Sequence, residues 1–132
     1  MLLTPDDFTR RAVGLPWVRW RADWAGMDCF GLLVLWHREV LGIDLGPVPQ
    51  TDIADGFARA SGWQECAPED GATCFMAWRS GAPSHCGVLL AGGQVLHSEG
   101  SPEKPGSVRV SRLSAMQRLY GDLRFYRRAA AC

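Results

Sequence analysis

The sequence predicts an α+β domain, in which helices come first and an antiparallel sheet follows. Apolar residues recur at helical spacing in the first half of the chain, whereas after Gly62 they form short runs separated by turn residues. The chain has 132 residues, of which 47% are hydrophobic. A chain of this length can form one hydrophobic core but is short for two, so we expect a single domain over 1–132.

The first helix is predicted to begin after Thr4, which is a good N-cap residue. Pro5 suits the first turn, and the two acids that follow it favour the positive end of the helix dipole. The helix is expected to end before Gly14. The next segment, 15–26, contains three tryptophans without regular periodicity, and we expect an ordered loop there.

The most regular helical pattern begins at Asp28, a second N-cap residue. From Cys29 onward apolar residues recur at helical spacing, and Gly42 is expected to end the helix. These apolar positions are Leu32, Leu33, Trp36 and Val40. A proline-rich connection then leads to a shorter predicted helix over 52–60, with Asp52 as its cap.

The second half of the chain reads as strands joined by turns. The predicted strands cover 63–66, 73–79, 86–90, 94–98, 107–113 and 123–127. The third and fourth of these are expected to form a hairpin, because the sequence Ala91-Gly92-Gly93 between them is typical of a tight loop. A helical turn is predicted over 114–120.

The composition argues against two classes of partner. The formal net charge is zero, whereas nucleic-acid binding needs a basic surplus or patch. The longest nearly unbroken apolar stretch is 29–36, and spanning a bilayer takes about 20 apolar residues, so no membrane insertion is expected. Residues 1–7 show no basic flank followed by an apolar stretch, so we expect synthesis in the cytoplasm without a signal peptide.

The chain has five cysteines, an odd number, and no two are spaced C-x-x-C. A disulfide framework and a structural zinc site are therefore not expected, and no other metal or cofactor is expected either. Cys66, Cys74 and Cys86 are interpreted as small buried hydrophobic residues. Cys132 is the last residue, and we interpret it as part of a frayed end.

Cys29 occupies a position where a thiolate forms easily. It directly follows the predicted N-cap, where first-turn amides and the helix dipole favour negative charge. A nucleophilic cysteine also needs a base, usually histidine, within hydrogen-bond reach. His37 lies eight residues further along the same helix, about 12 Å of axial rise, so we interpret it as a partly exposed helix residue. The alternative that Cys29 is simply packed stays open.

His85 and His97 flank the predicted hairpin, and the loop length decides whether they share a face. A two-residue turn puts them on opposite faces. A three-residue loop over 91–93 sets Gly87 opposite His97, so that the two histidines lie diagonally on one face with Gly87 leaving room between their rings. The alternatives are a polar residue at a strand entrance for His85 and a hydrogen-bonded core histidine for His97.

Three motifs resemble those of the NlpC/P60 cysteine peptidases. They are Asp28-Cys29-Phe30-Gly31-Leu32, Ser84-His85-Cys86-Gly87-Val88 and Val95-Leu96-His97. The twelve-residue step between the two histidines matches the family's usual spacing. The "DCxGL" and "VLH" variants are similar to those of bacteriophage tails and phage-derived gene transfer agents. The resemblance runs from about Leu15 to Ser98.

The resemblance implies a papain-like fold and hydrolysis of peptide bonds in the stem peptides of peptidoglycan. It implies Cys29 as the nucleophile, His85 as the base and His97 as the residue that orients His85. The backbone amide of Cys29 is then expected to stabilise the oxyanion of the tetrahedral intermediate.

The sequence departs from the family pattern near the motif cysteine. Trp17 stands where the family usually has a tyrosine that helps the oxyanion site, the two glycines that commonly follow are missing, and Phe30 replaces a small residue. An indole N–H donates one hydrogen bond and accepts none, so Trp17 is a candidate oxyanion or substrate residue of a different kind. Arg19 and Arg21 are candidates for binding carboxylates of the stem peptide.

A wall hydrolase acts outside the cytosol, so the resemblance implies carriage on a phage-like tail and docking to a tail hub or baseplate protein. The expected function is an endopeptidase that opens the cell wall locally. Two alternatives stay open: a structural tail or baseplate component with the same scaffold and little or no activity, and an amidase or acyltransferase. The six tryptophans fit a docking patch, a substrate cleft or the core.

Overall fold

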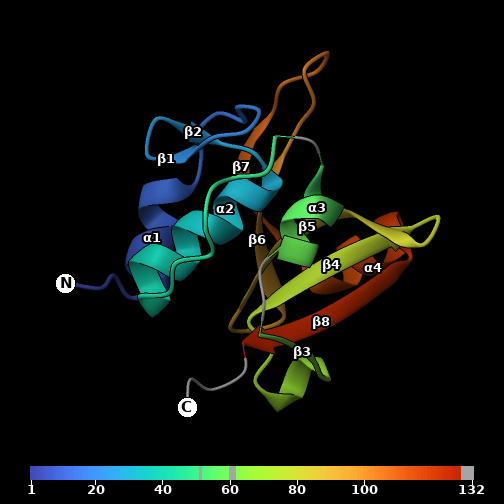
Figure 1. The fold of residues 1–132 in the computed structure, drawn as a ribbon. Helices are drawn as coiled ribbons and strands as arrows, with labels where there is room; N and C mark the ends of the chain where they lie inside the picture. The colour runs from blue at the N-terminus through green and yellow to red at the C-terminus, as the bar shows by residue number, and fades with distance from the viewer. Residues whose placement is uncertain (51, 60–61, 129–132) are drawn as a thin grey trace.

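The computed structural model describes residues 1–50, 52–59 and 62–128. Within these ranges, six strands form one antiparallel sheet and two further short strands form a separate ribbon (Figure 1). Helices α1 (Pro5–Ala12), α2 (Cys29–Trp36) and α3 (Ile53–Arg59) come before the sheet, and α4 (Leu113–Tyr120) connects two of its strands. The predicted α+β class, with N-terminal helices packed on an antiparallel sheet, is confirmed.

The six-stranded sheet of the described residues has the strand order β3-β8-β4-β5-β6-β7. Its strands are β3 (Trp63–Glu65), β4 (Cys74–Arg79), β5 (Ala82–Leu90), β6 (Gln94–Glu99), β7 (Ser107–Arg112) and β8 (Asp122–Arg128). Each predicted strand has its counterpart, and α4 occupies the predicted helical turn. β5 begins earlier than predicted because a two-residue turn at Ser80-Gly81 folds β4 straight back, with Arg79 opposite Ala82.

The predicted caps of the first two helices are confirmed. The Thr4 hydroxyl accepts a hydrogen bond from the amide of Asp7 at 3.1 Å, and the Asp28 carboxylate accepts one from the amide of Gly31 at 2.7 Å. Every α2 residue after Cys29 is buried, so this helix is covered on all sides. None of the helices in the described ranges has the length and apolarity that crossing a bilayer requires.

The end of α2 corrects the prediction for His37. The helix continues as a π-helical turn, His37–Leu41, before Gly42 ends it in the left-handed conformation at a φ of 69°. His37 is 0% exposed, not partly exposed. Its ring meets the Trp63 ring edge-on at 5.8 Å, because β3 of the distant sheet edge packs over this end of the helix. The exposure that we predicted from helical spacing alone was therefore wrong.

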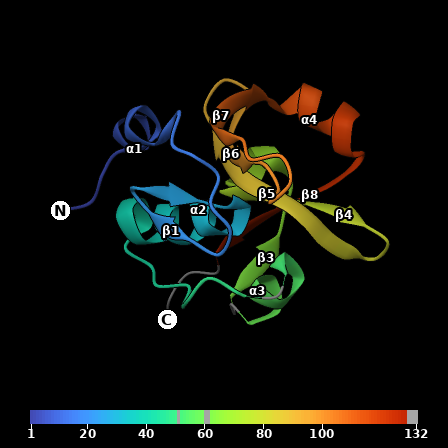
Figure 2. The same cartoon turned by 90° about the horizontal axis from the view of Figure 1, so that it is seen from above.

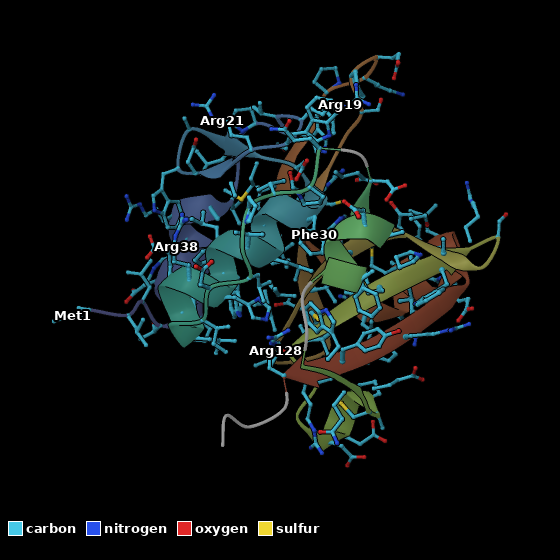
Figure 3. All side chains as sticks on the ribbon, viewed as in Figure 1. Met1, Arg19, Arg21, Phe30, Arg38 and Arg128 are labelled. Atoms are coloured by element: carbon cyan, nitrogen blue, oxygen red, sulfur yellow. The ribbon has the colours of Figure 1, made fainter. Side chains whose placement is uncertain are left out.

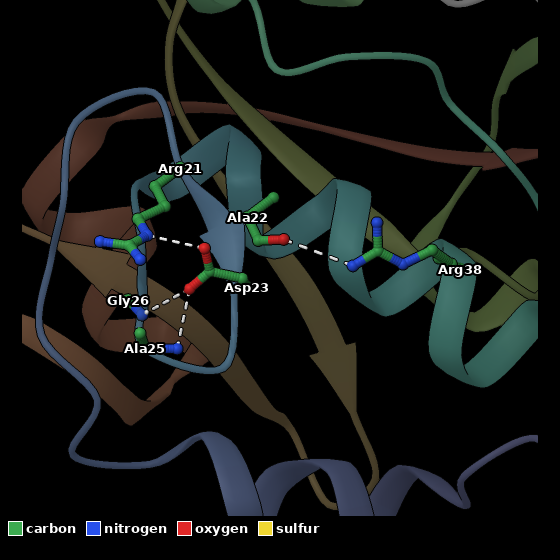
Figure 4. Close-up of polar contacts among 6 residues, drawn as sticks. All are labelled: Arg21, Ala22, Asp23, Ala25, Gly26 and Arg38. Carbon is green, nitrogen blue, oxygen red and sulfur yellow. Dashed lines mark hydrogen bonds and ion pairs between the residues drawn. The ribbon is translucent and has the colours of Figure 1, made fainter.

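Segment 15–26 is also more regular than the predicted loop. It contains a small antiparallel ribbon made of β1 (Ala22–Asp23) and β2 (Gly26–Met27). The Asp23 carboxylate closes the turn between these strands, since it accepts hydrogen bonds from two following amides (Figure 4). The ribbon matters for the site because the chain immediately before it, residues 17–20, reaches over the start of α2.

The hydrophobic core lies on both faces of the sheet. α2 packs against one face, which includes Cys86, Val88 and Leu96, whereas α4 covers the other face through Met116 and Tyr120. Figure 2 shows α2 and α4 on opposite sides of the sheet.

The cysteine predictions hold in part. Cys74 and Cys86 are fully buried as predicted, whereas Cys66 is only half-buried because it lies just beyond the end of β3 at the sheet edge. Cys132 lies outside the described residues.

Of the two loop lengths considered for the hairpin, the structure has the three-residue loop. Leu90 pairs with Gln94, which leaves residues 91–93 as the loop. Gly92 and Gly93 both adopt left-handed conformations, with φ of 74° and 70°, which explains why glycines occupy the loop. The same register sets Gly87 opposite His97, as predicted, so the two histidines of the hairpin share a face.

Candidate active site

Cys29 is the first residue of α2, and Asp28 fixes the backbone around it. One carboxylate oxygen of Asp28 accepts the Gly31 amide, and the other accepts the Trp20 amide at 2.6 Å. Trp20 has a φ of 59°, a left-handed conformation that favours glycine, which fits its place where glycines are common in the family. Burial, opposed by these hydrogen bonds, raises the pKa of Asp28 to about 6. Asp28 therefore ties the preceding loop to the helix start.

The surroundings of Cys29 favour its thiolate. A hydrogen bond from the Cys86 thiol is the largest cause that lowers the pKa of Cys29 well below its ordinary value, and the hydrogen bond and charge of His85 add to it. Burial acts in the opposite direction. Cys86 itself is held as a thiol, since burial raises its pKa well above the ordinary value. Cys86, predicted only as a packing residue, thus also contributes to the lowered pKa of the candidate nucleophile.

The two histidines meet in the geometry that the register predicts. Nε2 of His85 lies 3.1 Å from Nδ1 of His97, and the ring centroids are 5.2 Å apart at an interplanar angle of 85°. Gly87 makes this approach feasible: a Cβ there would lie 2.6 Å from the carbonyl oxygen of Leu96 and 2.9 Å from the Cβ of His97. Position 87 therefore requires glycine for the strand of His97 to approach this closely.

A hydroxyl extends the histidine pair beyond the predicted residues. Nε2 of His97 lies 2.9 Å from Oγ of Ser111 on β7. Burial, with the charge of His85 as a second cause, lowers the pKa of His97 to about 4, so this imidazole is neutral at pH 7. Ser111 was missed because its role depends on strand pairing: Arg109 pairs with His97, and Ser111 lies two residues further on the same face.

The direction of the hydrogen bonds follows from this neutral imidazole. It has one N–H and one acceptor nitrogen. When Nδ1 of His97 accepts from Nε2–H of His85, Nε2–H of His97 donates to Ser111. Nδ1 of His85 is then the nitrogen left to serve Cys29, whose pKa His85 lowers. His85, His97 and Ser111 thus form a hydrogen-bonded chain, and its first member lines the same cavity as Cys29.

A cavity of about 210 Å³ opens at this chain. Cys29 and His85 line it, together with Trp17, Arg19, Trp20, Asp28, Phe30, Pro49, Asp52, Ile53, Ser84, Ser98 and Gly100. Two of the three further candidates, Trp17 and Arg19, thus lie where a substrate would bind. The Trp17 backbone is held by the carbonyl of Gly106 at 2.9 Å, so its side chain forms a fixed part of the wall.

Arg21, the third further candidate, is not among the residues that line this cavity. Its Nε donates to the Asp23 carboxylate at 2.6 Å, within the β1–β2 ribbon (Figure 4). Figure 3 shows Arg21 on the ribbon, away from Phe30 at the cavity wall, whereas Arg19 lies towards the β6–β7 connection. Arg21 is close to Cys29 in sequence, but Asp23 on the same ribbon is its charge partner.

Four of the six tryptophans belong to the core or pack against it, and the other two line the cavity. Trp36 is buried in the core, and Trp24, Trp63 and Trp78 pack against it. Trp17 and Trp20 line the cavity, and the guanidinium of Arg19 lies over the Trp20 ring at 4.7 Å. Among the described residues, no group of three or more histidine, cysteine or acidic side chains is arranged to hold a metal ion.

Comparisons with known proteins agree with this fold and with the motifs. The chain is similar to the crystal structure of the NlpC/p60 domain of the peptidoglycan hydrolase SagA, with a TM-score of 0.60 and 24% sequence identity over 89% of this chain and 91% of that chain. No curated protein matches the sequence. The NlpC/P60 family matches residues 16–124, a span that contains Cys29, His85 and His97. This match covers most of the chain, and the protein therefore belongs to the NlpC/P60 family of cysteine peptidases and peptidoglycan hydrolases.

Proposed function

We propose that this protein is a cysteine endopeptidase that cleaves peptide bonds in the stem peptides of peptidoglycan. One observation carries the proposal: a thiol with a lowered pKa begins a helix beside a cavity, and His85, His97 and Ser111 form a directed hydrogen-bond chain behind it. Family membership supports peptidoglycan as the substrate class. In this proposal Cys29 is the nucleophile, His85 is the acid and base, and His97 orients His85.

The reaction begins with attack of the Cys29 thiolate on the carbonyl carbon of the scissile bond. The oxyanion is stabilised by the Cys29 amide, because the first amides of a helix have no intrahelical acceptor. His85, as imidazolium, then donates a proton to the leaving amine and the thioester forms. A water molecule that loses its proton to His85 attacks the thioester, which releases the acid product and restores the thiolate–imidazolium pair.

The cavity wall supports a peptide substrate that carries carboxylates. Arg19 is exposed and lines the cavity, so its guanidinium is available to a substrate carboxylate. Trp17 supplies a rigid aromatic wall where the family has a tyrosine, and we assign its indole N–H as the second oxyanion donor. Replacing Arg19 is therefore expected to raise KM, whereas replacing Arg21 leaves it unchanged.

We also propose that the protein acts as part of a phage-like tail particle, docked to a hub or baseplate protein after synthesis in the cytoplasm. The "DCxGL" and "VLH" variants of the motifs support this assignment. Labelling the chain and imaging intact particles by electron microscopy tests it: label at the tail tip is expected, and purified particles without the chain would contradict it.

Digestion of purified peptidoglycan tests the enzymatic proposal. The variant Cys29→Ala is expected to lose activity by about 10³-fold or more, because covalent catalysis is removed while the fold remains. Cys66→Ala is the matched control, since Cys66 is half-buried and lies outside the cavity. Equal activity of Cys29→Ala and the parent would overturn the proposal.

The products separate the remaining alternatives. Mass spectrometry of defined muropeptides is expected to show cleavage between amino acids of the stem peptide. Cleavage between the sugar and the peptide would instead indicate an amidase, and transfer to an added amine an acyltransferase. A folded parent protein without turnover, whose Cys29 is alkylated as slowly as an ordinary thiol, would indicate a structural tail component.

A further inference from the structure

The His85 ring has a neighbour that the proposed reaction does not use. Tyr120, the last residue of α4, stacks on it with ring centroids 4.9 Å apart and an interplanar angle of 15°. Phe75 also approaches His85, but at 6.2 Å and 59°, so it does not stack. The imidazole therefore presents one edge to His97, one nitrogen to Cys29 and one face to Tyr120.

The Tyr120 ring is held in place from several directions. Its hydroxyl donates to the Glu99 carboxylate on β6 at 3.5 Å, and the other oxygen of that carboxylate accepts from Arg109 on β7 at 3.1 Å. The ring also packs against the apolar cluster under α4, which includes Met116 and Phe125. Burial is the largest cause that raises the pKa of Tyr120 to about 12, so the ring is a neutral phenol at working pH.

We propose that Tyr120 is a positioning residue for the Cys29–His85 pair: its stacked face fixes the plane of the His85 imidazole and stabilises the imidazolium that accompanies the Cys29 thiolate. The inference rests on the proposed function, in which that ion pair is the reactive state. An aromatic face attracts a cation within about 6 Å, because its quadrupole presents negative charge there. The 4.9 Å separation satisfies this condition.

Other charges near the pair do not take over this role. Among the described residues, the titratable and charged groups near His85, Tyr120 and Cys29 lie on several elements. They are Asp28 before α2, Cys29 on α2, Arg79 on β4, Cys86 on β5, His97 and Glu99 on β6, and Arg109 on β7. Cys86 stays a thiol because burial raises its pKa. His97 is neutral, and Glu99 is paired with Arg109. Arg79 is a cation and disfavours a second positive charge nearby. The stacked ring is thus the neighbour that faces the imidazole plane and favours its charged form.

The pH dependence of Cys29 alkylation tests the inference without any substrate. Modification by iodoacetamide would be followed at Cys29 by peptide mass spectrometry in the parent, in Tyr120→Phe and in Tyr120→Leu. Loss of the aromatic face is expected to move the midpoint of Cys29 alkylation in Tyr120→Leu upward by about 0.4–1.5 pH units. Tyr120→Phe keeps the face and is expected to titrate close to the parent, within about 0.2 units.

Two outcomes would overturn the inference. One is a folded Tyr120→Leu variant whose Cys29 titrates like that of the parent. The other is a Tyr120→Phe variant that shifts as far as Tyr120→Leu, because the hydroxyl bond to Glu99 would then be responsible. Circular dichroism and thermal unfolding establish that each variant is folded.

A second series keeps the test valid if Tyr120→Leu does not fold. Phenylalanines with increasing numbers of ring fluorines at position 120 keep the shape of the side chain while they weaken the negative charge on its face. The midpoint of Cys29 alkylation is expected to rise steadily along this series. A flat series would contradict the stabilisation of the imidazolium by the ring.

The design also separates this inference from the proposed function. Alkylation needs no turnover, so a parent protein that fails to digest peptidoglycan would defeat the proposed function while the titration still reports on Tyr120. Where digestion is present, the acidic limb of kcat/KM is expected to shift with the alkylation midpoint, with KM almost unchanged. If Tyr120→Leu digests peptidoglycan and the acidic limb of its kcat/KM profile lies at the same pH as in the parent, the role of Tyr120 is contradicted and the proposed function stands.

Discussion

Two regions of the molecule each bury a neutral histidine: the end of α2 holds His37, and the β5–β6 hairpin holds His97. Both side chains are nearly inaccessible, at 0% and 1% exposed, and burial is the main cause that lowers the pKa of each to about 4. Burial therefore has the same effect on the two imidazoles. What differs is the set of groups that their ring nitrogens meet.

The His37 ring hydrogen-bonds to a backbone carbonyl, whereas the His97 ring lies between two side chains that it contacts through its nitrogens. Nδ1–H of His37 donates to the carbonyl of Leu33 at 2.8 Å, and its buried Nε2 has no hydrogen-bond partner among the described residues. Nδ1 of His97 faces His85, and Nε2 faces Ser111. The two rings thus carry their protons on opposite nitrogens. In both regions the lowered pKa of the histidine reports burial. Only the hydrogen-bond partners of the ring nitrogens distinguish the candidate site.

The largest expected difference between the regions is in activity. His97→Phe keeps an aromatic ring but removes the acceptor for His85, so kcat/KM on a defined stem peptide is expected to fall by about 10²–10³-fold. His37→Phe is the matched change at the other buried histidine and is expected to keep kcat/KM within about threefold, because His37 does not line the cavity. Similar losses in the two variants would show that both act through stability.

The two regions are expected to behave alike in the pH dependence of stability. Each histidine has a lower pKa in the folded chain than the 6.5 of an unfolded one, so below pH 6.5 the unfolded state binds more protons. Stability is therefore lost as the pH falls from 6.5 towards 4, by at most about 3 kcal/mol for each histidine. Asp28 has the opposite effect on stability between pH 6 and 3.8. Its pKa is raised in the folded chain, so the folded state binds more protons there and gains stability as the pH falls.

Urea unfolding between pH 7 and 4.5 measures this effect. The parent is expected to lose free energy of unfolding on acidification, since two histidines outweigh one aspartate. His37→Phe and His97→Phe are each expected to lose less of it over the same range. A His37→Phe variant with the same pH slope as the parent would show that burial does not hold this ring neutral.

The comparison also shows what could be predicted from the sequence. The helix start at Cys29 follows from a local rule, because an N-cap residue precedes it. Side-chain alternation limited the two hairpin histidines to the same face or opposite faces, and the loop length decided between these. Their assignment as site residues came from the resemblance of the motifs. The burial of His37 could not be predicted in this way, since it depends on Trp63, far along the chain.

Ser111 and Tyr120 were missed for the same reason as the burial of His37. The first depends on pairing between β6 and β7, and the second on the return of α4 over the sheet. Arg21 shows the converse case: it is close to Cys29 along the chain, but it pairs with Asp23 and does not line the cavity.

The smallest expected effect concerns the hydroxyl of Ser111, which His97 contacts. Ser111→Ala leaves Nε2 of His97 without that partner, as Nε2 of His37 already is. A lost hydrogen bond of about 1 kcal/mol is expected to lower kcat/KM by about 3–10-fold, with KM unchanged, because the bond orients rather than reacts. Ser111→Thr keeps the hydroxyl and is expected to recover most of the activity, whereas Ser114→Ala on exposed α4 surface is the neutral control. If Ser111→Ala matches Ser114→Ala, the chain of functional groups ends at His97, and the two buried histidines differ only in the contact that one of them makes with His85.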